Sequence, residues 1–421
     1  MADVDPALTG TAGAPLAPAG PAEVTPEDYR AGFGEDLRRT LDLSTWSAGE
    51  DLSDVYQRLE EEIAAAVAQE GDLQAAIRRR IFPELAGYPG APKGAGVYRA
   101  SPAALKRVHR GLLFNGGVEG CDGTQQTHDT LPLTIAQVGV SLVSYQGSQG
   151  TWGQRLFRRD LRVGSGDLAS EMVDVLQRRT ARGGQNQPGR RDRLSDLMRR
   201  GIMTYAERAI LLERSTAVWR LGHGSPAPYE LITGAGLRDF MVESTRVIRE
   251  LVEGHQKFVF VASEPSDRLL LTIGQALRPL EYAIVRPYTD QIHTMIEYGD
   301  YRGSASVDTT WDGVKLTPAA WIKKFRDVVG PRVVVGVYRA THAAPAQVFY
   351  AHVDHADVAA HVVLADSVLQ WHRGFPLLLD LAHHVCSGVF GGDTLSGPVA
   401  TAYADAGAPW RYASERMSRA L

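Results

Sequence analysis

Residues 229–285 read YELITGAGLRDFMVESTRVIRELVEGHQKFVFVASEPSDRLLLTIGQALRPLEYAIV, and short β-branched and aromatic runs alternate there with longer amphipathic stretches. The strand-like runs are YELIT (229–233), KFVFVAS (257–263) and LEYAIV (280–285). Apolar residues recur at helical spacing between them, over about 237–253 and 266–277. Strands that alternate with helices are typical of layered α/β proteins. We therefore predict an α/β fold with a mixed central sheet flanked by helices.

The segments on both sides extend this pattern. Toward the C-terminus we predict two antiparallel strands and then two helices, at PRVVVGVYRA (331–340), AQVFYAHV (346–353), about 357–372 and 375–389. Toward the N-terminus we predict paired strands in LPLTIAQVGVSLVSYQG (131–147), followed by helices over about 166–181 and 192–222.

The first hundred residues have a different composition. Residues 1–45 are rich in Ala, Pro, Gly and Asp, which predicts a mobile tail, because such a stretch buries too little apolar surface to offset its ordering entropy. Residues 46–111 form a predicted helical region, amphipathic from about 47 to 82. Its apolar face packs either on the chain's own core or on a partner. The main domain is expected at 112–421.

Composition excludes several classes of protein. The chain has 421 residues and a formal charge of -4. Its net charge therefore gives no indication that it binds a polyanion such as nucleic acid over its whole surface. Two cysteines, Cys121 and Cys386, are too few for a secreted disulfide scaffold and fit a reducing compartment. No signal peptide and no apolar run of membrane-spanning length is present in the sequence. We expect a cytoplasmic protein that does not bind membranes.

Common catalytic signatures are absent from the sequence. It contains no glycine-rich phosphate loop followed by Lys-Ser/Thr, no GxSxG elbow and no paired CxxC motifs. Candidates for chemistry are therefore individual carboxylates, histidines and arginines.

Asp122 is the first candidate, in Cys121-Asp122-Gly123-Thr124 at the end of a predicted strand. A carboxylate at a sheet edge, beside a glycine that lets the backbone turn, suits a hard divalent cation. The alternative is that Asp-Gly is simply a turn.

Glu213 is the second candidate, near the middle of the predicted helix AERAILLERSTAVWRL. Its helical neighbours Ile210, Leu211 and Ala217 are apolar, so the carboxylate faces the core in one interpretation. In the other it is solvated and pairs with Arg214 or Arg220.

His383 is the third candidate, in GFPLLLDLAHH (374–384). Pro376 fixes the first helical turn, and His383 follows Phe375 by eight residues, so both project from nearly the same helix face. Such a histidine binds a phosphate, positions water or ligates a metal. Otherwise it is structural, and His384 is a surface residue.

A basic segment is the fourth feature. Eight arginines stand against two aspartates between residues 178 and 200. The candidates for contacts with nucleic-acid phosphates are Arg178, Arg179, Arg182, Arg190, Arg191 and Arg193. The alternative is a solvated loop whose charges only aid solubility.

Taken together, the order of these features resembles the NurA nuclease family. That family has a strand ending in Asp-Gly-Ser/Thr, a helix bearing Glu, a strand ending in Asp-Gly and a late Tyr-Pro-x-x-Leu-x-x-Ala-His helix. The counterparts here are Asp122-Gly123-Thr124, Glu213, Thr233-Gly234, and Phe375-Pro376 through Ala382-His383. The resemblance covers roughly residues 112 to 395, and the last motif is its most specific part.

The resemblance implies an RNase H-like core that cleaves DNA with Mn²⁺ (or Mg²⁺). It also implies a homodimer that works with a HerA-type hexameric ATPase in DNA end processing, repair or phage defence. Carried over residue by residue, Asp122 and Glu213 are metal ligands, and His383 acts near the scissile phosphate.

Two positions depart from the family pattern. Thr233 stands in place of the second Asp, and Phe375 in place of Tyr. Glu230 faces the opposite side of the predicted strand, whereas Asp239 starts the next helix and reaches back as a replacement ligand. The chain is then either a nuclease with a rebuilt metal site or a catalytically degenerate DNA-binding and scaffold subunit. A metal hydrolase for small molecules ranks last, since only the histidines support it.

Overall fold

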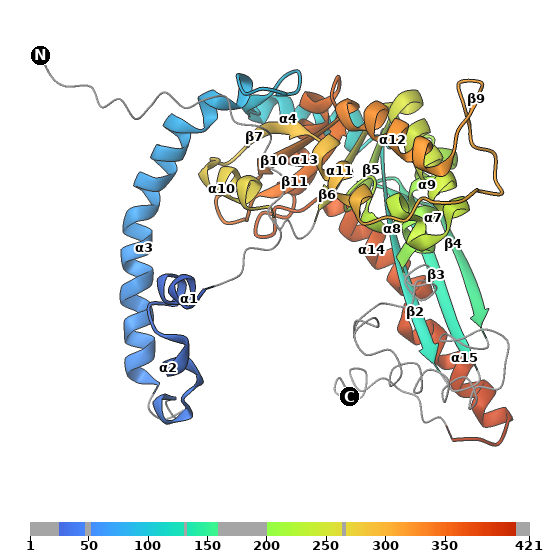
Figure 1. The fold of residues 1–421 in the computed structure, drawn as a ribbon, viewed down its shortest axis with the longest axis horizontal. Helices are drawn as coiled ribbons and strands as arrows, with labels where there is room; N and C mark the ends of the chain where they lie inside the picture. The colour runs from blue at the N-terminus through green and yellow to red at the C-terminus, as the bar shows by residue number, and fades with distance from the viewer. Residues whose placement is uncertain (1–24, 47–51, 130–132, 159–199, 263–266, 410–421) are drawn as a thin grey trace, which may run out of the picture. The chain divides into compact units, whose positions relative to one another are not determined.

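A computed structural model describes residues 25–46, 52–129, 133–158, 200–262 and 267–409 (Figure 1). The chain divides into two compact units, Met1–Gly71 and Asp72–Leu421. None of the helices of the described residues is long and apolar enough to cross a membrane.

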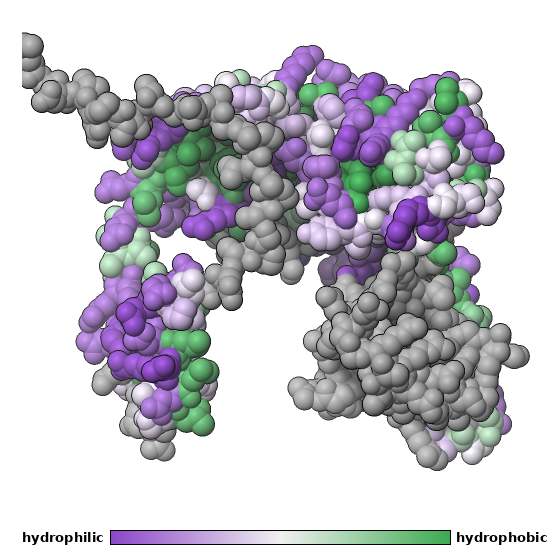
Figure 2. Space-filling model, in the orientation of Figure 1, coloured by the Kyte–Doolittle hydropathy of each residue, from purple (hydrophilic) through white to green (hydrophobic). Residues whose placement is uncertain are grey.

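The described residues of the first unit form helices. Their bounds are α1 (Pro26–Phe33), α2 (Leu37–Leu41), the 3₁₀ turn η2 (Leu43–Thr45) and the beginning of α3 (Ser53–Arg80). The structure thus differs from the expected tail for residues 26–45. The reason is local: Thr25 and Asp28 form a capping box at the start of α1, and Gly34 ends it with a φ of 73°. Figure 2 shows apolar surface on these helices.

The second unit is built on one nine-stranded mixed sheet within the described residues. In sheet order the strands are β1 (Gly96–Arg99), β7 (Glu281–Pro287), β10 (Val333–Arg339), β11 (Gln347–His352), β6 (Phe258–Ala262), β5 (Trp219–His223), β2 (Val118–Asp129), β3 (Thr134–Ser144) and β4 (Gly147–Arg158). β2, β5 and β6 are parallel neighbours, and the remaining pairs are antiparallel. This sheet, flanked by helices, confirms the predicted α/β class.

Side chains of the central strands alternate between two cores, as the pleat requires. In β6, Phe258 and Phe260 belong to one core, and Val259 and Val261 belong to the other. Helices that contribute to the first core are α7 (Ile202–Glu213), α8 (Tyr229–Thr233), α9 (Arg238–Glu250), α10 (Arg268–Ala276), α11 (Thr289–Glu297) and α12 (Pro318–Val329). Those of the second core are α4 (Pro102–Val108), α13 (Ala356–Ser367) and α14 (Leu377–Phe390).

Shorter elements complete the description. They are η4 (Phe82–Ala86), η5 (His109–Leu113), η7 (Gly234–Gly236), η8 (Leu251–His255), η9 (Gly330–Arg332), the hairpin of β8 (Thr310–Trp311) and β9 (Val314–Lys315), and α15 (Gly392–Asp405). In Figure 1, α14 runs alongside the long strands β2 and β3, against which it packs.

Two predictions of local structure are wrong. Residues 229–233 form the helix α8 rather than a strand, because the segment begins after Pro228 and turns sharply at Gly234, whose φ is 60°. The helix predicted over about 192–222 ends at Glu213, and residues 219–223 form β5. β5 is covered on both faces, so it lacks the alternation by which an exposed strand is recognised. The helix predicted over about 166–181 lies outside the described residues.

Candidate functional site

Asp122 lies inside β2, not at its end. The strand continues to Asp129, and Asp122 pairs with Ser141 of β3, so Asp-Gly does not make a turn here. The Asp122 side chain is only 6% exposed. Gly123 is required by close packing, since a Cβ atom there would lie 2.6 Å from Oε1 of Glu207.

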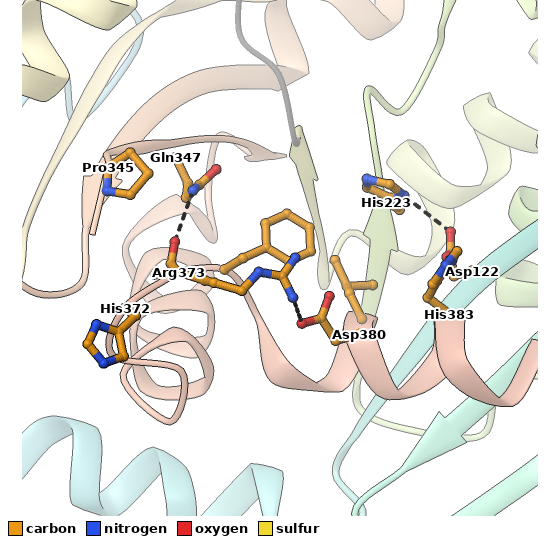
Figure 3. A pocket seen from close by; sticks show the side chains of 10 residues that line it. Asp122, His223, Pro345, Gln347, His372, Arg373, Asp380 and His383 are labelled. Carbon is orange, nitrogen blue, oxygen red and sulfur yellow. Dashed lines mark hydrogen bonds and ion pairs between the residues drawn. The ribbon is translucent and has the colours of Figure 1, made fainter. Parts of the chain in front are cut away.

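Two histidines hold the Asp122 carboxylate. Nδ1 of His383 on α14 donates to Oδ2 at 2.9 Å, and Nδ1 of His223 on β5 donates to Oδ1 at 3.2 Å (Figure 3). The parallel register pairs Cys121 with Gly222, which brings the next residues, Asp122 and His223, side by side. Elements distant in the sequence thus converge at the end of β5.

α14 is anchored so that His383 faces Asp122. The buried Asp366 accepts a hydrogen bond at 2.9 Å from the amide of Leu378, in the first turn of α14. Ser141 of β3 donates to the carbonyl of Ala382 at 2.6 Å, one residue before His383. These contacts fix the height and rotation of the helix on the sheet.

Electrostatics favours a charged cluster at Asp122. Burial tends to raise the pKa of Asp122, but the hydrogen bonds from His223 and His383 more than offset it, and the pKa is lowered. The hydrogen bond to Asp122 raises the pKa of His223 and likewise that of His383. Both imidazoles therefore tend toward their protonated form beside the carboxylate.

Glu207 is a buried carboxylate close to this cluster. It lies on α7, packs against Gly123 and forms an ion pair with Arg208. Burial raises its pKa to about 7, although the charge of Arg208 opposes the shift. Arg208 also donates to the carbonyl of His223 at 3.0 Å, which links the pair to the end of β5.

A cavity of about 500 Å³ opens beside Asp122. Its polar lining includes His223, His383, His372, Arg373 and Asp380. Figure 3 shows Asp122, His223 and His383 together at one end, His372 at the other, and the Arg373–Asp380 ion pair between them. Three histidines and Arg373 share its walls with the carboxylates of Asp122 and Asp380, and the volume is that of a site for a small ligand.

The structure does not bring the other predicted ligands to Asp122. Glu213 is exposed at the C-terminal end of α7, two turns beyond Glu207. Asp239 accepts a hydrogen bond from the amide of Ser306 at 2.6 Å. Thr233 is buried at the end of α8, where its hydroxyl donates to the carbonyl of Tyr229. Neither Glu213 nor Asp239 lines the cavity beside Asp122.

The strand end that lies beside Asp122 carries His223. β5 ends in His223-Gly224, beside Asp122, whereas Thr233-Gly234 ends a helix. Sequence reasoning missed His223 because the predicted helix extended through residue 222. The run WRLGHG (219–224), with an aromatic residue, a branched apolar one and a closing glycine, was the signal for a strand end.

Of the remaining predicted site residues, Phe375 lies at the cavity and the six arginines cannot be placed. Phe375 lines the cavity, and its ring meets the His223 ring edge to face at 5.8 Å between centroids. The predicted phosphate contacts, Arg178, Arg179, Arg182, Arg190, Arg191 and Arg193, lie outside the described residues.

The donor atoms around Asp122 are engaged with one another rather than arranged around a metal ion. Within the described part of the chain, no three His, Cys, Asp or Glu side chains are placed as a group that holds a metal ion. A cation would have to compete with two imidazole N–H groups for the Asp122 oxygens and with Arg208 for Glu207. The donor groups nearest to one another are two carboxylates and two imidazoles. Imidazole nitrogen is a better ligand for transition-metal ions than for Mg²⁺, which prefers oxygen.

Comparison with known proteins gives structural matches only. No family model and no curated protein sequence matches the chain. It is similar to the NurA nuclease from Sulfolobus solfataricus, with 11% identity over 83% of this chain and 97% of that one, and a TM-score of 0.39. A structure of NurA bound to dAMP and manganese matches with 10% identity over 78% of this chain and 93% of that one, and a TM-score of 0.34.

Ciona intestinalis endonuclease V, in complex with a DNA that contains inosine, also matches, with 10% identity over 78% of this chain and 97% of that one. Its TM-score is 0.23.

Proposed function

We propose that this chain is a DNA nuclease whose phosphodiester-cleaving site is the cavity beside Asp122. One observation carries the proposal: the two motif residues Asp122 and His383, 261 positions apart, meet at 2.9 Å on the wall of a cavity with several cationic groups. The resemblance of their motifs to those of NurA nucleases supports DNA as the substrate.

The geometry suits proton transfer. Because Nδ1 of His383 is directed at Asp122, the ring is oriented and Nε2 becomes the nitrogen that faces other partners; it lies 3.4 Å from Oγ of Ser387. An imidazole held by a carboxylate accepts a proton from attacking water or, when protonated, donates one to the leaving oxygen. His223 has the same relation to Asp122 and provides a second such group.

We propose further that cleavage depends on a divalent metal ion. Asp122, Glu207 and the two imidazoles would hold it only after giving up their present hydrogen bonds and ion pair, and the imidazoles their extra protons, because no three such side chains of the described residues are grouped for a metal. Bound there, Mn²⁺ would supply Lewis-acid stabilisation of charge on the phosphate and lower the pKa of a bound water. Because half of these donors are nitrogen atoms, we expect Mn²⁺ to support activity better than Mg²⁺ does.

A cleavage assay on linear DNA tests the function. The purified chain is incubated with Mn²⁺, with Mg²⁺ and with EDTA, and products are followed on denaturing gels. Asp122→Ala and His383→Ala should each lower the rate at least about 100-fold, the usual scale for loss of a general acid–base group. The matched control is Glu213→Gln, an exposed carboxylate that should leave the rate unchanged. Equal cleavage by the wild type and Asp122→Ala would refute the site.

A catalytically degenerate DNA-binding subunit is the second candidate. It is favoured by the occupied oxygens of Asp122 and by the ion pair that engages Glu207. This candidate predicts no cleavage with any metal but salt-sensitive binding of DNA. Arg190→Ala with Arg191→Ala should then reduce the slope of log affinity against log salt by about 2, as expected for two lost phosphate contacts.

The resemblance to NurA nucleases also supports the proposal of a partner ATPase. A NurA-like subunit would act as a homodimer with a HerA-type hexameric ATPase in DNA end processing or phage defence. The test is co-expression with such an ATPase encoded nearby, followed by light scattering of the purified complex and a cleavage assay with ATP. Separate elution of the two proteins, with no ATP effect on cleavage, would reject this partnership.

A further inference from the structure

An exposed aromatic and basic segment borders the far end of the cavity. Trp371, His372 and Arg373 are consecutive, exposed residues of the connection between α13 and α14. Trp371 is 50% exposed, whereas the large Trp side chains of the core, Trp311 and Trp321, are fully buried. His372 and Arg373 line the same cavity as Asp122 (Figure 3).

The connection is held in place by β11 and by the loop between β10 and β11. Oγ1 of Thr341 donates to the Trp371 carbonyl at 2.5 Å, and Nε2 of Gln347 donates to the Arg373 carbonyl at 3.4 Å. Gly374 has a φ of 59°, and a Cβ atom there would lie 2.5 Å from Cβ of Ala344. The three side chains are therefore presented by a fixed backbone.

The rings of the segment lie close together in tilted arrangements. The centroids of Trp371 and His372 are 3.6 Å apart at an interplanar angle of 41°, and the His342 ring lies 6.2 Å from Trp371. A half-exposed indole beside two imidazoles offers aromatic surface to a planar ligand. Nucleic-acid bases stack on such surfaces without regard to sequence, provided that they are unpaired.

Arg373 supplies the complementary charge. Its side chain is 61% exposed while Nη1 pairs with Asp380 and donates to Oε1 of Gln370 at 3.4 Å, and its guanidinium carbon lies 5.9 Å from the centroid of the Phe375 ring. Asp380 thereby orients the guanidinium within the cavity, and its other donors are left for a phosphate, which arginine binds through its planar fork.

We propose that Trp371, His372 and Arg373 form a subsite for an unpaired DNA base and its phosphate, so that the strand enters the cavity single-stranded on its way to Asp122. The inference rests on the proposed function only in placing cleavage at Asp122. Binding of an unpaired base at Trp371 does not depend on cleavage. A base pair would shield both faces of the base from the indole, so blunt duplex DNA would not use the subsite.

A binding experiment without cleavage tests the subsite. The full chain carrying Asp122→Asn, in EDTA, is titrated into fluorescein-labelled oligo(dT) of about twelve nucleotides, within the usual site size for such proteins. Binding is followed by fluorescence anisotropy. Adding Trp371→Ala should weaken binding by about 5- to 150-fold, the loss of one base–aromatic stack. Trp371→Phe should retain most of the affinity.

The matched control is Trp46→Ala, which removes an exposed Trp of the first unit and should leave the affinity unchanged. A blunt duplex of the same length should bind Trp371→Ala and its parent equally. The proposal is overturned if Trp371→Ala binds oligo(dT) within about twofold of its parent, or if single and duplex DNA lose affinity alike.

The two proposals fail separately in these experiments. A chain that never cleaves DNA but loses oligo(dT) affinity with Trp371→Ala keeps the subsite and loses the nuclease assignment. A chain that cleaves DNA through Asp122 but binds oligo(dT) equally well with Trp371→Ala keeps the nuclease and loses the subsite.

Discussion

At the scale of single residues, Asp122 is the point on which the other groups of the site depend. It orients His223 and His383 through separate carboxylate oxygens. Sharing one carboxylate between two imidazoles raises the pKa of both rings and lowers that of Asp122. The cluster is therefore most favourable when all three groups are charged.

The charged cluster predicts a pH-dependent contribution to stability. A raised histidine pKa stabilises the fold fully below about pH 6.5, the unfolded value, and this contribution is lost as pH rises through the folded pKa. The lowered pKa of Asp122 contributes above about pH 4 and is lost as pH falls. Wild type should thus exceed Asp122→Asn in Tm by more at pH 6 than at pH 9.

Thermal unfolding in EDTA, followed by circular dichroism at both pH values, measures this difference. His384→Asn is the matched control, since its ring contacts the Asp380 carbonyl rather than Asp122. A Tm difference between wild type and Asp122→Asn that is constant from pH 6 to 9 would show that the imidazoles carry no extra charge.

Gly123 provides a second prediction at residue scale. A Cβ atom at this position would lie 2.6 Å from Oε1 of Glu207 and 2.7 Å from Cγ of Met203. Gly123→Ala should therefore destabilise the fold by about 1–3 kcal/mol, the cost of overpacking, and displace Glu207. Urea unfolding measures the loss. Gly388→Ala, in open space on α14, is the control and should be neutral or slightly stabilising.

At the scale of elements, α14 determines where His383 lies. Its C-terminal end crosses β3 and β4 at two glycines: Cβ atoms at Gly139 and Gly153 would lie 2.2 and 2.3 Å from ring atoms of Phe390. The absence of side chains there lets the Phe390 ring rest directly on the strands. Gln137 also donates to the Phe390 carbonyl at 3.0 Å and fixes the helix end.

A double-mutant cycle tests this contact. Gly139→Ala should destabilise the fold by about 1–3 kcal/mol because Phe390 cannot yield without moving α14. In a Phe390→Ala background the same change should cost much less, since the obstructing ring is gone. Free energies of unfolding from denaturant titrations give the coupling. Additive effects of the two substitutions would exclude the close approach of helix and strands.

At the scale of the whole molecule, the two units differ in how they bury side chains. From Thr25 to Gly71, none of the residues whose burial the structure describes is buried. Large side chains of this unit, including Leu41, Leu43 and Trp46, are exposed. Figure 2 shows hydrophobic surface on its helices. The second unit contains the sheet and both cores.

This contrast predicts that the second unit is stable by itself. A chain that begins at Asp72 should unfold cooperatively with a Tm within about 2 °C of the full chain, because none of the deleted residues whose burial the structure describes is buried. Differential scanning calorimetry measures both. A markedly lower Tm of the shorter chain would show that residues 1–71 help to stabilise the sheet.

Local sequence patterns determined much of the sheet. Four predicted strands are present in the structure as β6, β7, β10 and β11, from the runs at 257–263, 280–285, 331–340 and 346–353. Long runs of apolar and β-branched residues favour a strand whatever the rest of the fold, so local sequence is enough to predict them. YELIT (229–233) has too few residues for the spacing of its apolar side chains to distinguish a strand from a helix. The positive φ of Gly234, which ends the segment, favours the helix.

The sequence by itself also determined which groups are capable of chemistry: the carboxylate of Asp122 and the imidazole of His383 follow from motifs. Only the tertiary structure decided what they meet. His223 reaches Asp122 through the parallel register of β2 and β5, and Glu207, not Glu213, faces Gly123. Local periodicity fixes the elements, but strand order and helix rotation are set by burial across the whole chain, and these place the side chains of a site.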